Sequence, residues 1–461
     1  MGTTTVAFTE AAWRELTSAL DENLERAWVL TARLVRTDAS RHTTLLVRSV
    51  LTVPDETYLL RSHDGLSIAS AGWVPAFRAA SDSDCLPIFV HTHPGGEPKP
   101  SSHDDVVDKQ LRSVAGVRTE LGHYASLVLG GKASSPAFSG RVYLSGSVQH
   151  LEVDRVRVVG ERLSITSAWS SDDDDVQTEI FDRQVRAFGE AGQHTLRQLK
   201  VGVVGAGGTG SAVIEQLARL GVGELTIVDL DTLTETNVTR VYGSSLSDVD
   251  RPKVDIAAEH VKAIGLGTTV IPVHGSLLDK QVALALAHSD ILFGCTDDHA
   301  GRTLLTRMPQ AMLQLLIDCG VTIDSRNEAV HEIWGRVSIV SPTSPCLVCL
   351  GEIDPDKASA EQLPAAEHAR RVAEGYAPEL KTPDPSVVTY TSATAAFAVN
   401  EGISRVLGYS EAEPANRILY GMINRRLSTA HRPRQGTHSC GKADRIAAGL
   451  HGAFLNWGWT Q

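Results

Sequence analysis

The sequence predicts an α/β protein in two parts, a mixed sheet with helices followed by a doubly wound, mostly parallel sheet. Three observations predict this class. The chain has 461 residues, 42% hydrophobic and 21% charged, which is enough for two ordinary globular domains. A run of four aspartates at 172–175 interrupts it. After that run, short apolar segments alternate with helical ones, the rhythm of parallel strands joined by crossover helices.

The acidic run predicts the boundary between the two domains. Adjacent carboxylates repel one another and offer no apolar face for packing, so we expect residues 166–178 to form a solvated linker. The first domain is then expected at 1–165 and the second at 179–461.

Hydrophobic periodicity predicts the main elements on both sides of the linker. In the first domain we expect strands at 43–47 and 86–90 and an amphipathic helix at 8–16. In the second domain we expect strands at 200–204, 224–228 and 269–273 and helices at 211–220 and 392–407. Residues 352–385 are rich in Pro, Ala, Glu and Lys with weak periodicity, which predicts a crossover loop or additional helices.

Charge, hydropathy and cysteine usage exclude several classes of protein. A net charge of −12 argues against nucleic acid as the main partner, because phosphate neutralisation needs clustered Lys and Arg. No apolar run reaches about 18 residues and the first residues lack a signal-peptide pattern, so no membrane partner is expected. The six cysteines are too scattered for a disulfide scaffold, which favours a cytoplasmic protein with thiols free for metal.

Two histidines and an aspartate have the spacing of a catalytic metal site. His91 and His93 alternate at the end of an apolar run, so both project from one face of a strand. Asp104 follows a turn rich in Pro and Gly, three residues after Ser101. Two imidazoles and one carboxylate leave the fourth position of a zinc ion open for water, as catalytic sites do. Such chemistry also requires a proton shuttle, usually a glutamate that does not bind the metal.

The pattern His-x-His-Pro-x(6)-Ser-x-x-Asp resembles the JAMM (MPN/JAB) metalloprotease family over roughly residues 5–165. The resemblance implies an MPN-type mixed sheet and a catalytic Zn²⁺ held by His91, His93 and Asp104. It also implies that Ser101 stabilises the tetrahedral intermediate.

The same resemblance implies an upstream catalytic glutamate just before a strand. Glu25 is the candidate and Glu22 the alternative, although the glycine-rich stretch that usually follows this glutamate is absent. Two other interpretations remain open. The histidines are chance neighbours, or the domain is metal-free and only binds a partner.

A glycine-rich loop follows the first strand of the second domain. Residues 205–211 read Gly-Ala-Gly-Gly-Thr-Gly-Ser between a buried strand and a helix. Glycines let the backbone approach a phosphate closely, and the helix N-terminus adds oriented N–H groups. Asp229 ends the next strand, where a carboxylate accepts from ribose hydroxyls. To this point an NAD-dependent dehydrogenase fits as well as an enzyme that uses ATP.

Cations and a further carboxylate favour ATP over NAD. Asn237 and Arg240, then Lys253, Asp297 and Arg302, follow the glycine loop along the chain. A triphosphate needs Arg and Lys to neutralise it and an Asp to hold Mg²⁺, whereas a nicotinamide site needs no such set.

These strings resemble the ThiF/MoeB/HesA and ubiquitin-activating adenylyltransferase family over about residues 177–461. The resemblance implies a Rossmann-like, ThiF-type fold that binds ATP and Mg²⁺. The residues implied for this site are Gly205, Gly207, Gly208, Asp229, Asn237, Arg240, Lys253 and Asp297, the last of them on Mg²⁺. Arg183, within Phe-Asp-Arg-Gln at 181–184, is implied to reach the triphosphate of a partner subunit, which predicts a homodimer.

The metal-binding cysteines depart from the pattern of that family. The family's structural zinc site uses two Cys-x-x-Cys pairs. Here Cys346 and Cys349 form the first pair, but only Cys440 stands where the second is expected. His438 is the candidate fourth ligand, and the alternative is a metal-free knuckle held by packing.

The crossover segment also departs from the pattern, because it has no cysteine to carry a thioester. Two routes remain open for the acyl group. The adenylate passes directly to an outside nucleophile, or the hydroxyl of Thr382 or Ser386 accepts it as an oxyester, although hydroxyls are weak nucleophiles without a base.

The two halves together predict a bifunctional enzyme whose substrate is a ubiquitin-like protein. A zinc (iso)peptidase would process or remove that protein, and an adenylyltransferase would activate its C-terminal glycine. The alternative is activation of a sulfur carrier, with the first domain used for processing or only for binding. A conjugating enzyme or a sulfur donor is the expected downstream partner. An NAD-dependent oxidoreductase is the remaining, less favoured function.

Overall fold

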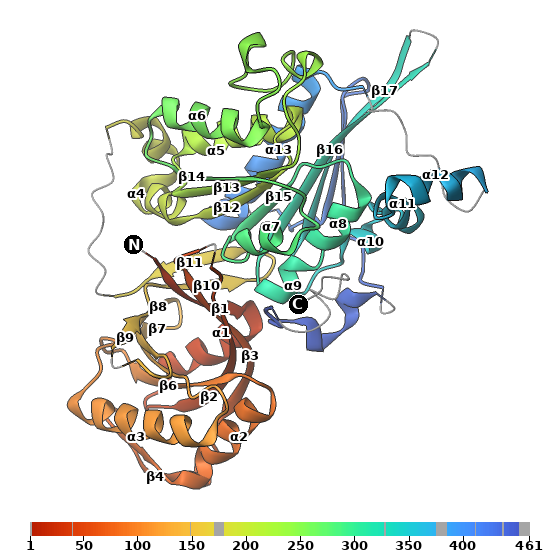
Figure 1. Ribbon diagram of the computed structural model, residues 1–461. Coiled ribbons are helices and arrows are strands. Elements are labelled where there is room, and N and C mark those ends of the chain that lie inside the picture. The colour runs from red at the N-terminus through yellow and green to blue at the C-terminus, as the bar shows by residue number, and fades with distance from the viewer. Residues whose placement is uncertain are drawn as a thin grey trace. The chain divides into compact units, whose positions relative to one another are not determined.

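The computed structural model describes residues 2–38, 40–147, 149–169, 179–326, 329–374, 385–410, 412–435 and 438–450. The chain divides into two compact units, each with its own large sheet (Figure 1). Unit 1 comprises residues 1–174 with 446–450, and unit 2 comprises residues 175–445 with 451–461. The aspartate run expected to form a linker lies outside the described residues.

Unit 1 is built on a nine-stranded mixed sheet in the order β11-β10-β1-β3-β2-β6-β7-β8-β9. Its strands are β1 (Thr4–Thr9), β2 (Ala27–Val35), β3 (Thr43–Thr52), β6 (Leu86–Pro94), β7 (Tyr124–Lys132), β8 (Ser135–Tyr143), β9 (His150–Glu152), β10 (Arg155–Val159) and β11 (Leu163–Ser167). β1 is parallel to β10 and β3, and β6 is parallel to β7. A separate hairpin joins β4 (Tyr58–Arg61) to β5 (Leu66–Ile68). β11 extends to Ser167, so residues 166 and 167 of the range expected for the linker belong to a strand.

Both faces of this sheet are covered by helices: α1 (Glu10–Ser18), α2 (Val74–Asp82) and α3 (Ser102–Arg118). Trp28 and Leu30 on β2 pack in one core with residues of β1 and α1. Their neighbours Ala27 and Val29 pack in the opposite core, with α2 and α3. This alternation is why β2 reads as continuously apolar. The first helix begins at Glu10 rather than at residue 8, because Thr9 ends β1 and caps the helix.

The last residues of unit 1 come from the C-terminal part of the chain. Residues 446–450 pack on the strands β2 and β3. A Cβ on Gly449 would lie 3.4 Å from Cβ of Arg33 and 3.5 Å from Leu46. Unit 1 is therefore assembled from two separate stretches of the chain.

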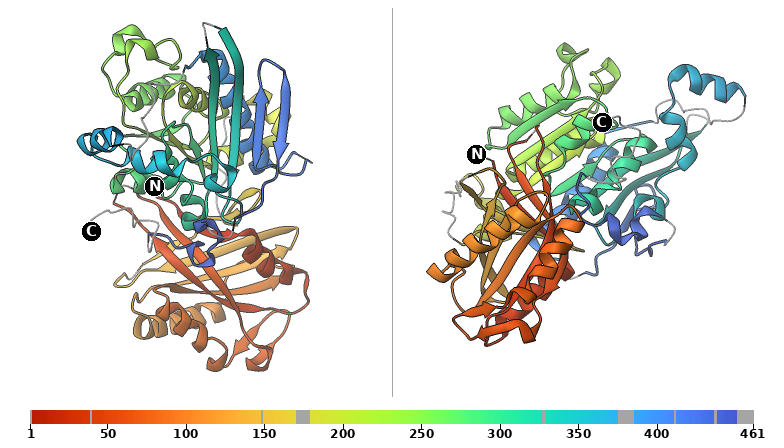
Figure 2. Two further views of the ribbon diagram at one scale, coloured as in Figure 1. Left: turned by 90° about the vertical axis from the view of Figure 1, so that its right-hand side faces the viewer. Right: turned by 60° about the horizontal axis from the view of Figure 1, so that its bottom comes forward.

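Unit 2 is built on an eight-stranded sheet in the order β14-β13-β12-β15-β16-β17-β18-β19. Its strands are β12 (Lys200–Val204), β13 (Glu224–Asp229), β14 (Thr269–His274), β15 (Ile291–Gly294), β16 (Leu315–Arg326), β17 (Ala329–Val340), β18 (Arg417–Gly421) and β19 (Arg426–Ala430). The first five strands in this list are parallel where they pair, as the sequence predicts. The last three pair antiparallel, and β16 and β17 form a long hairpin with β18 and β19 beside it (Figure 2).

Helices lie on both faces of the parallel half of this sheet. The helices of unit 2 are α4 (Asp182–Gln198), α5 (Gly208–Leu220), α6 (Lys253–Ile264), α7 (Lys280–Ala285), α8 (His299–Leu305), α9 (Met308–Met312), α10 (Leu347–Leu350), α11 (Pro355–Glu361), α12 (Ala365–Ala373) and α13 (Val388–Leu407). α5 and α6 cover one face, and α7 and α8 the other (Figure 1). The crossover segment contributes α11 and α12, so it contains additional helices. Among the described residues, no helix is long and apolar enough to cross a membrane.

Candidate functional sites

Two histidines and an aspartate of unit 1 come together at the end of β6 and the start of α3. His91 and His93 lie two residues apart on β6, so their side chains leave the same face of the sheet. Asp104 lies in the first turn of α3, which Ser101 caps. His91 is buried and the other two are half-buried. The structure therefore brings together the three residues that the sequence predicts as metal ligands.

The donor atoms of these side chains are spaced like ligands of one ion. Nε2 of His91 lies 3.2 Å from Nε2 of His93 and 3.2 Å from Oδ1 of Asp104. Tetrahedral ligands about 2.0–2.1 Å from zinc lie about 3.3 Å from one another, so both distances fit. Nδ1 of His93 lies 3.0 Å from the carbonyl oxygen of Glu97. By donating a proton there, His93 leaves Nε2 free to bind a metal.

The electrostatics of the group favour the protonation states that bind metal. Burial alone would raise the pKa of Asp104, but the hydrogen bond and charge of His91 and the hydrogen bonds of Ser101 hold it below its usual range. Burial lowers the pKa of His93, and the charge of His91 lowers it further. A carboxylate that stays ionised and an imidazole that stays neutral are the forms that ligate a metal.

Glu25 lies just before β2 and faces the same group. Its Oε1 is 3.9 Å from Nε2 of His93, and its side chain is buried. Burial is the main cause that raises the pKa of Glu25 from 4.5 to about 7. Glu22, the alternative in the sequence, instead pairs with Arg26 and Arg61. Of the two glutamates, it is Glu25 that lies beside the histidines.

Ser101 lies next to the same group, but its hydroxyl is already engaged. Its Oγ accepts from the N–H of Asp104 at 3.2 Å and donates to Oδ2 of Asp104 at 2.7 Å. This capping box begins α3 and fixes the orientation of the Asp104 carboxylate. Stabilisation of an oxyanion by Ser101 stays a prediction.

The glycine loop of unit 2 lies where the strand order reverses, with β12 between β13 and β15. Gly205 has a φ of +92°, and a Cβ there would lie 2.7 Å from the carbonyl oxygen of Cys295, so this turn requires glycine. A Cβ on Gly207 would meet nothing within 4 Å. The loop therefore leaves open space at the N-terminus of α5, where doubly wound sheets bind phosphates.

Two carboxylates and a lysine border this loop. Asp229 accepts from the N–H of Ala206 at 2.6 Å and from the N–H of Asp231 at 2.8 Å. Burial raises the pKa of Asp229, and the charge of Lys253 opposes that shift. Lys253 begins α6, is 8% exposed, and has its Nζ 2.7 Å from Oδ2 of Asp231. Asp231, which the sequence analysis did not single out, therefore holds the lysine predicted to bind phosphate.

Arg240 lies against the start of α5. A Cβ on Gly208 would be 3.1 Å from Cδ of Arg240, and Nη1 of that arginine donates to the carbonyl oxygen of Thr236 at 2.7 Å. Asn237 sits one turn earlier, at the end of a 3-10 turn, Glu235–Asn237. Its side chain accepts from the N–H of Thr234. Asn237 thus shapes the turn that carries Arg240.

Asp297 follows β15, in the segment that touches the glycine loop through Cys295 and Gly205. Asp297 is exposed, and no hydrogen bond or ion pair of its carboxylate occurs within the described part of the chain. Arg302, which the sequence groups with the phosphate-binding cations, instead pairs with the buried Asp318 at 3.4 Å. Asp297 is thus open to a cation, whereas Arg302 is engaged inside the unit.

Glu361 is a further acidic residue beside Asp297. It ends α11, and its Oε2 accepts from the N–H of Ala300 at the start of α8, at 2.8 Å. Burial raises the pKa of Glu361, and the charges of Asp298 and Asp297 act in the same direction. Sequence reasoning missed this residue, because the crossover segment has little periodicity from which to place it.

Three more predicted residues lie in unit 2. Arg183 lies in the first turn of α4 and is exposed, with no partner of its side chain among the described residues. Its contact with a partner's triphosphate stays a prediction. Ser386 lies just before α13, and Thr382 lies outside the described residues.

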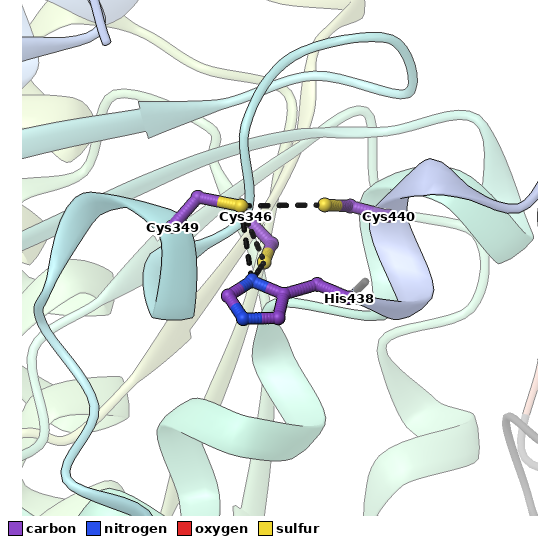
Figure 3. A group of neighbouring side chains, drawn as sticks. All are labelled: Cys346, Cys349, His438 and Cys440. Carbon is purple, nitrogen blue, oxygen red and sulfur yellow. Dashed lines mark hydrogen bonds between the residues drawn. The ribbon is translucent and has the colours of Figure 1, made fainter. Parts of the chain in front are cut away.

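Three cysteines and a histidine of unit 2 form a second candidate metal site (Figure 3). Sγ of Cys349 lies 3.6 Å from Sγ of Cys346, 3.5 Å from Sγ of Cys440 and 3.1 Å from Nδ1 of His438. Thiolates about 2.3 Å from a tetrahedral zinc lie about 3.8 Å apart, so the donors fit. Nε2 of Gln310 donates to the carbonyl oxygen of Cys440 at 2.8 Å, which supports the second half of the site. The structure therefore gathers a mixed Cys₃His set.

Comparison with known proteins concerns the second part of the chain. The model of the ThiF family matches residues 181–441. Over 127 residues the chain is 36% identical to the molybdopterin-synthase adenylyltransferase of Escherichia coli, covering 27% of this chain and 51% of that protein. Over 162 residues it is 32% identical to the SAMP-activating enzyme E1 of Haloferax volcanii, covering 35% of this chain and 57% of that protein.

Two further similarities cover a smaller share of the relative or have low sequence identity. The adenylyltransferase and sulfurtransferase UBA4 of Yarrowia lipolytica is 34% identical over 172 residues, 37% of this chain and 41% of that protein. The chain thus spans about half the length of these relatives. A solved structure of E. coli MccB with ATP has a TM-score of 0.45 and 18% identity, covering 58% of this chain and 75% of that one. A likeness at that level has no bearing on function.

Proposed function

The chain belongs to the ThiF family, and on that premise we propose that unit 2 uses ATP to adenylate the C-terminal carboxylate of a ubiquitin-like or sulfur-carrier protein. The relatives named as adenylyltransferases support this choice. One geometric observation carries the proposal. The open glycine loop is bordered by Arg240 and by Asp229, whose charge is opposed by the nearby Lys253, and the segment that leads to Asp297 contacts Gly205.

The residues of this site have separate roles in the proposed reaction. The N–H groups at the start of α5, with Arg240 and Lys253, neutralise and orient the phosphates of ATP. The carboxylate of the carrier then attacks the α-phosphate, and pyrophosphate leaves. No side chain has to act as a nucleophile, because positioning and charge neutralisation supply the catalysis. Mg²⁺ held by Asp297 would neutralise further charge on the phosphates.

The test is exchange of labelled pyrophosphate into ATP. The assay uses a small ubiquitin-fold protein that ends in Gly-Gly, and the same protein without its last glycine as the control. We expect exchange only with the intact tail, and we expect Asp297→Asn to abolish it. Binding of NAD to the wild-type protein with no binding of ATP would contradict the proposal.

The names of relatives bear on the fate of the acyl group. Relatives named as both adenylyltransferase and sulfurtransferase favour a sulfur carrier as the substrate. We propose that sulfide-level sulfur from a donor attacks the acyl carbon of the adenylate and AMP leaves, in preference to transfer to a conjugating enzyme. Appearance of a thiocarboxylate on the carrier, read as a mass increase of about 16 Da after incubation with ATP and sulfide, supports sulfur transfer.

We also propose that unit 2 acts as a homodimer in which Arg183 reaches the partner's nucleotide. The exposure of Arg183 at the start of α4 leaves it available for such a contact. If the proposal holds, mixing inactive Arg183→Ala with inactive Asp297→Asn restores part of the exchange activity, because one site of the mixed dimer is complete. A mixture that stays inactive, or a monomer in sedimentation, contradicts the dimer.

A second candidate function belongs to unit 1, a zinc-dependent hydrolysis of the peptide or isopeptide bond after the carrier's C-terminal glycine. It is favoured by the convergence of His91, His93 and Asp104 with the buried Glu25. Zinc held by the three ligands would polarise a carbonyl and activate water. Glu25 is a carboxyl whose pKa lies near neutrality, so it can take up a proton and pass it to the leaving amine.

The test separates metal binding from catalysis. The substrate is a fusion in which a reporter follows the Gly-Gly of a ubiquitin-fold protein. Wild-type protein loaded with zinc should cleave it, and Glu25→Gln should keep zinc but lose cleavage. His91→Ala should lose both. Absence of cleavage by zinc-loaded wild type, with the fusion still bound, supports instead a unit that serves for binding.

A further inference from the structure

The start of α5 is bordered by a residue that directly follows the crossover segment 352–385. A Cβ on Gly208 would lie 3.4 Å from Oγ of Ser386 and 3.1 Å from Cδ of Arg240. Ser386 comes 178 positions after Gly208, just ahead of α13. Three distant parts of the sequence therefore meet beside the open space at Gly207, namely the glycine loop, the turn that carries Arg240, and the residues that precede α13.

The placement of Ser386 is fixed by contacts between α5 and α13. Tyr242 bridges the two helices, because its N–H donates to Oγ of Ser211 at 3.1 Å and its hydroxyl lies 2.9 Å from Oγ of Ser392. Thr391 closes the first turn of α13 by donating to the carbonyl oxygen of Val387. Ser386, one residue before Val387, is therefore held on a rigid framework.

The hydroxyl of Ser386 has no hydrogen-bond partner among the described residues, although the residue is half-buried. A half-buried hydroxyl that makes no hydrogen bond to these residues can bond to water, and a ligand that replaces the water can accept the same hydrogen bond. Its neighbour Arg240 is a cation that donates hydrogen bonds and cannot accept a proton. The surroundings of Ser386 thus offer an anion a set of donors, and the described residues that lie against it, Gly208 and Arg240, include no base that would activate the hydroxyl as a nucleophile.

We propose that Ser386 binds the nucleotide by donating a hydrogen bond from Oγ to a phosphate oxygen of ATP, and that it does not accept the acyl group. The proposal rests on the proposed ATP site of unit 2 and assigns to it a residue that follows the crossover segment. The O–H of Ser386, the guanidinium of Arg240 and the N–H groups of α5 then surround one phosphate. Because Ser386 stands between the crossover segment and the N-cap residue Val387 of α13, the nucleotide would contact the chain where that segment ends.

The test compares Ser386→Ala with Thr389→Ala in the full-length protein. Thr389 is exposed on the first turn of α13 and serves as the matched control. Titration calorimetry with Mg·ATP measures the dissociation constant. Loss of a hydrogen bond to a charged phosphate should raise it about tenfold in Ser386→Ala. Thr389→Ala should bind like the wild type, and both variants should keep the wild-type melting temperature without nucleotide.

Separate titrations with AMP and with pyrophosphate identify the phosphate. Weaker binding of AMP by Ser386→Ala assigns the contact to the α-phosphate, and weaker binding of pyrophosphate assigns it to the outer phosphates. Equal ATP affinity of Ser386→Ala and wild type overturns the proposal. A wild-type protein that binds no ATP overturns the ATP site itself, and the proposal with it.

The acyl-acceptor alternative has its own readout. The protein is incubated with ATP and a Gly-Gly carrier and then analysed by denaturing mass spectrometry. A carrier adduct at Ser386 that survives thiols but is lost with hydroxylamine would overturn the proposal in favour of an oxyester. Absence of that adduct, together with the weaker ATP binding of Ser386→Ala, supports it.

Discussion

The carbonyl oxygen of Gly205 lies so close to Gly210 that a Cβ added to Gly210 would overlap that oxygen. Gly210 lies inside α5, where an alanine would ordinarily be the better helix former. Gly207, three residues earlier, faces open space instead. Two glycines of one loop therefore serve different purposes, since one permits the fold and the other leaves room for a ligand.

This difference predicts opposite results for two alanine substitutions. Gly210→Ala should destabilise unit 2 by about 1–3 kcal/mol or more, because the added methyl forces the loop backbone to move. Gly207→Ala should leave the melting temperature unchanged but weaken ATP binding, because its methyl enters the space where a phosphate approaches. Differential scanning calorimetry and Mg·ATP titration measure the two effects. A stable Gly210→Ala protein that binds ATP normally would show that the loop is less tightly packed than the structure indicates.

A second prediction concerns a buried carboxylate in unit 2. Asp318 is fully buried and lies between two guanidinium groups, those of Arg302 and Arg336. Asp318→Asn leaves Arg302 without its counter-charge and Arg336 with Glu352 alone, and should destabilise unit 2 by about 3–5 kcal/mol. The matched control is Asp324→Asn on the same strand, whose partner Arg326 is exposed, and it should cost much less stability because solvent screens that pair. Chemical denaturation followed by circular dichroism measures the free energy of unfolding of both variants. An equal loss of stability in the two variants would contradict this prediction.

Metal content provides a third prediction. We expect purified protein to hold about two zinc ions per chain, one at each cluster. His91→Ala should lose the ion of unit 1 and keep that of unit 2, and Cys349→Ser should do the reverse. Cys85→Ser is the control, because Cys85 is buried in unit 1 outside both clusters. Atomic emission measures the zinc, and retention of both ions in either cluster variant would refute that site.

The buried Glu25 predicts a dependence of stability on pH. Burial raises the pKa of Glu25 from 4.5 to about 7, so between these values the folded protein binds more protons than the unfolded one. The contribution of Glu25 to stability therefore falls as the pH rises through this window. In metal-free protein, Glu25→Gln should melt at a higher temperature than wild type at pH 8, and the difference should shrink at pH 4.5.

The control for this effect is Glu22→Gln, because Glu22 is half-exposed and paired with arginines. The difference in melting temperature between Glu22→Gln and wild type should be the same at pH 8 and at pH 4.5. A Glu25→Gln advantage of the same size at both pH values would mean that the carboxyl of Glu25 does not titrate in this range.

The sequence predicts three of the five parallel strands of unit 2, β12, β13 and β14, because they are short, mostly apolar and followed by or ended at glycine or aspartate. It places the start of α5 at Ser211, whereas the helix begins at Gly208. Two glycines in the first turn, Gly208 and Gly210, argue against a helix by propensity. Contacts of the loop with Cys295 and Arg240 impose the helical conformation there. These contacts join segments that are far apart in the sequence, so the local residue pattern does not predict them.

The candidate sites likewise contain residues that the local sequence places correctly and residues whose positions depend on tertiary packing. His91, His93 and Asp104 lie within one strand–turn–helix segment, so their spacing alone predicts that they meet. The pairing of Lys253 with Asp231 and the approach of Ser386 to Gly208 depend on how separate segments pack. Arg302 shows the reverse case. Its type and position predict a phosphate ligand, but a buried aspartate from the neighbouring strand engages it.

The return of residues 446–450 to unit 1 has a practical consequence for dissecting this protein. A fragment that ends at residue 174 would lack residues 446–450, which pack against Leu46 and Arg33. Its newly uncovered apolar surface would promote aggregation, whatever the state of its histidines. Inactivity of such a truncated piece would therefore say little about catalysis. Single substitutions in the intact chain are the cleaner way to assign an activity to either half.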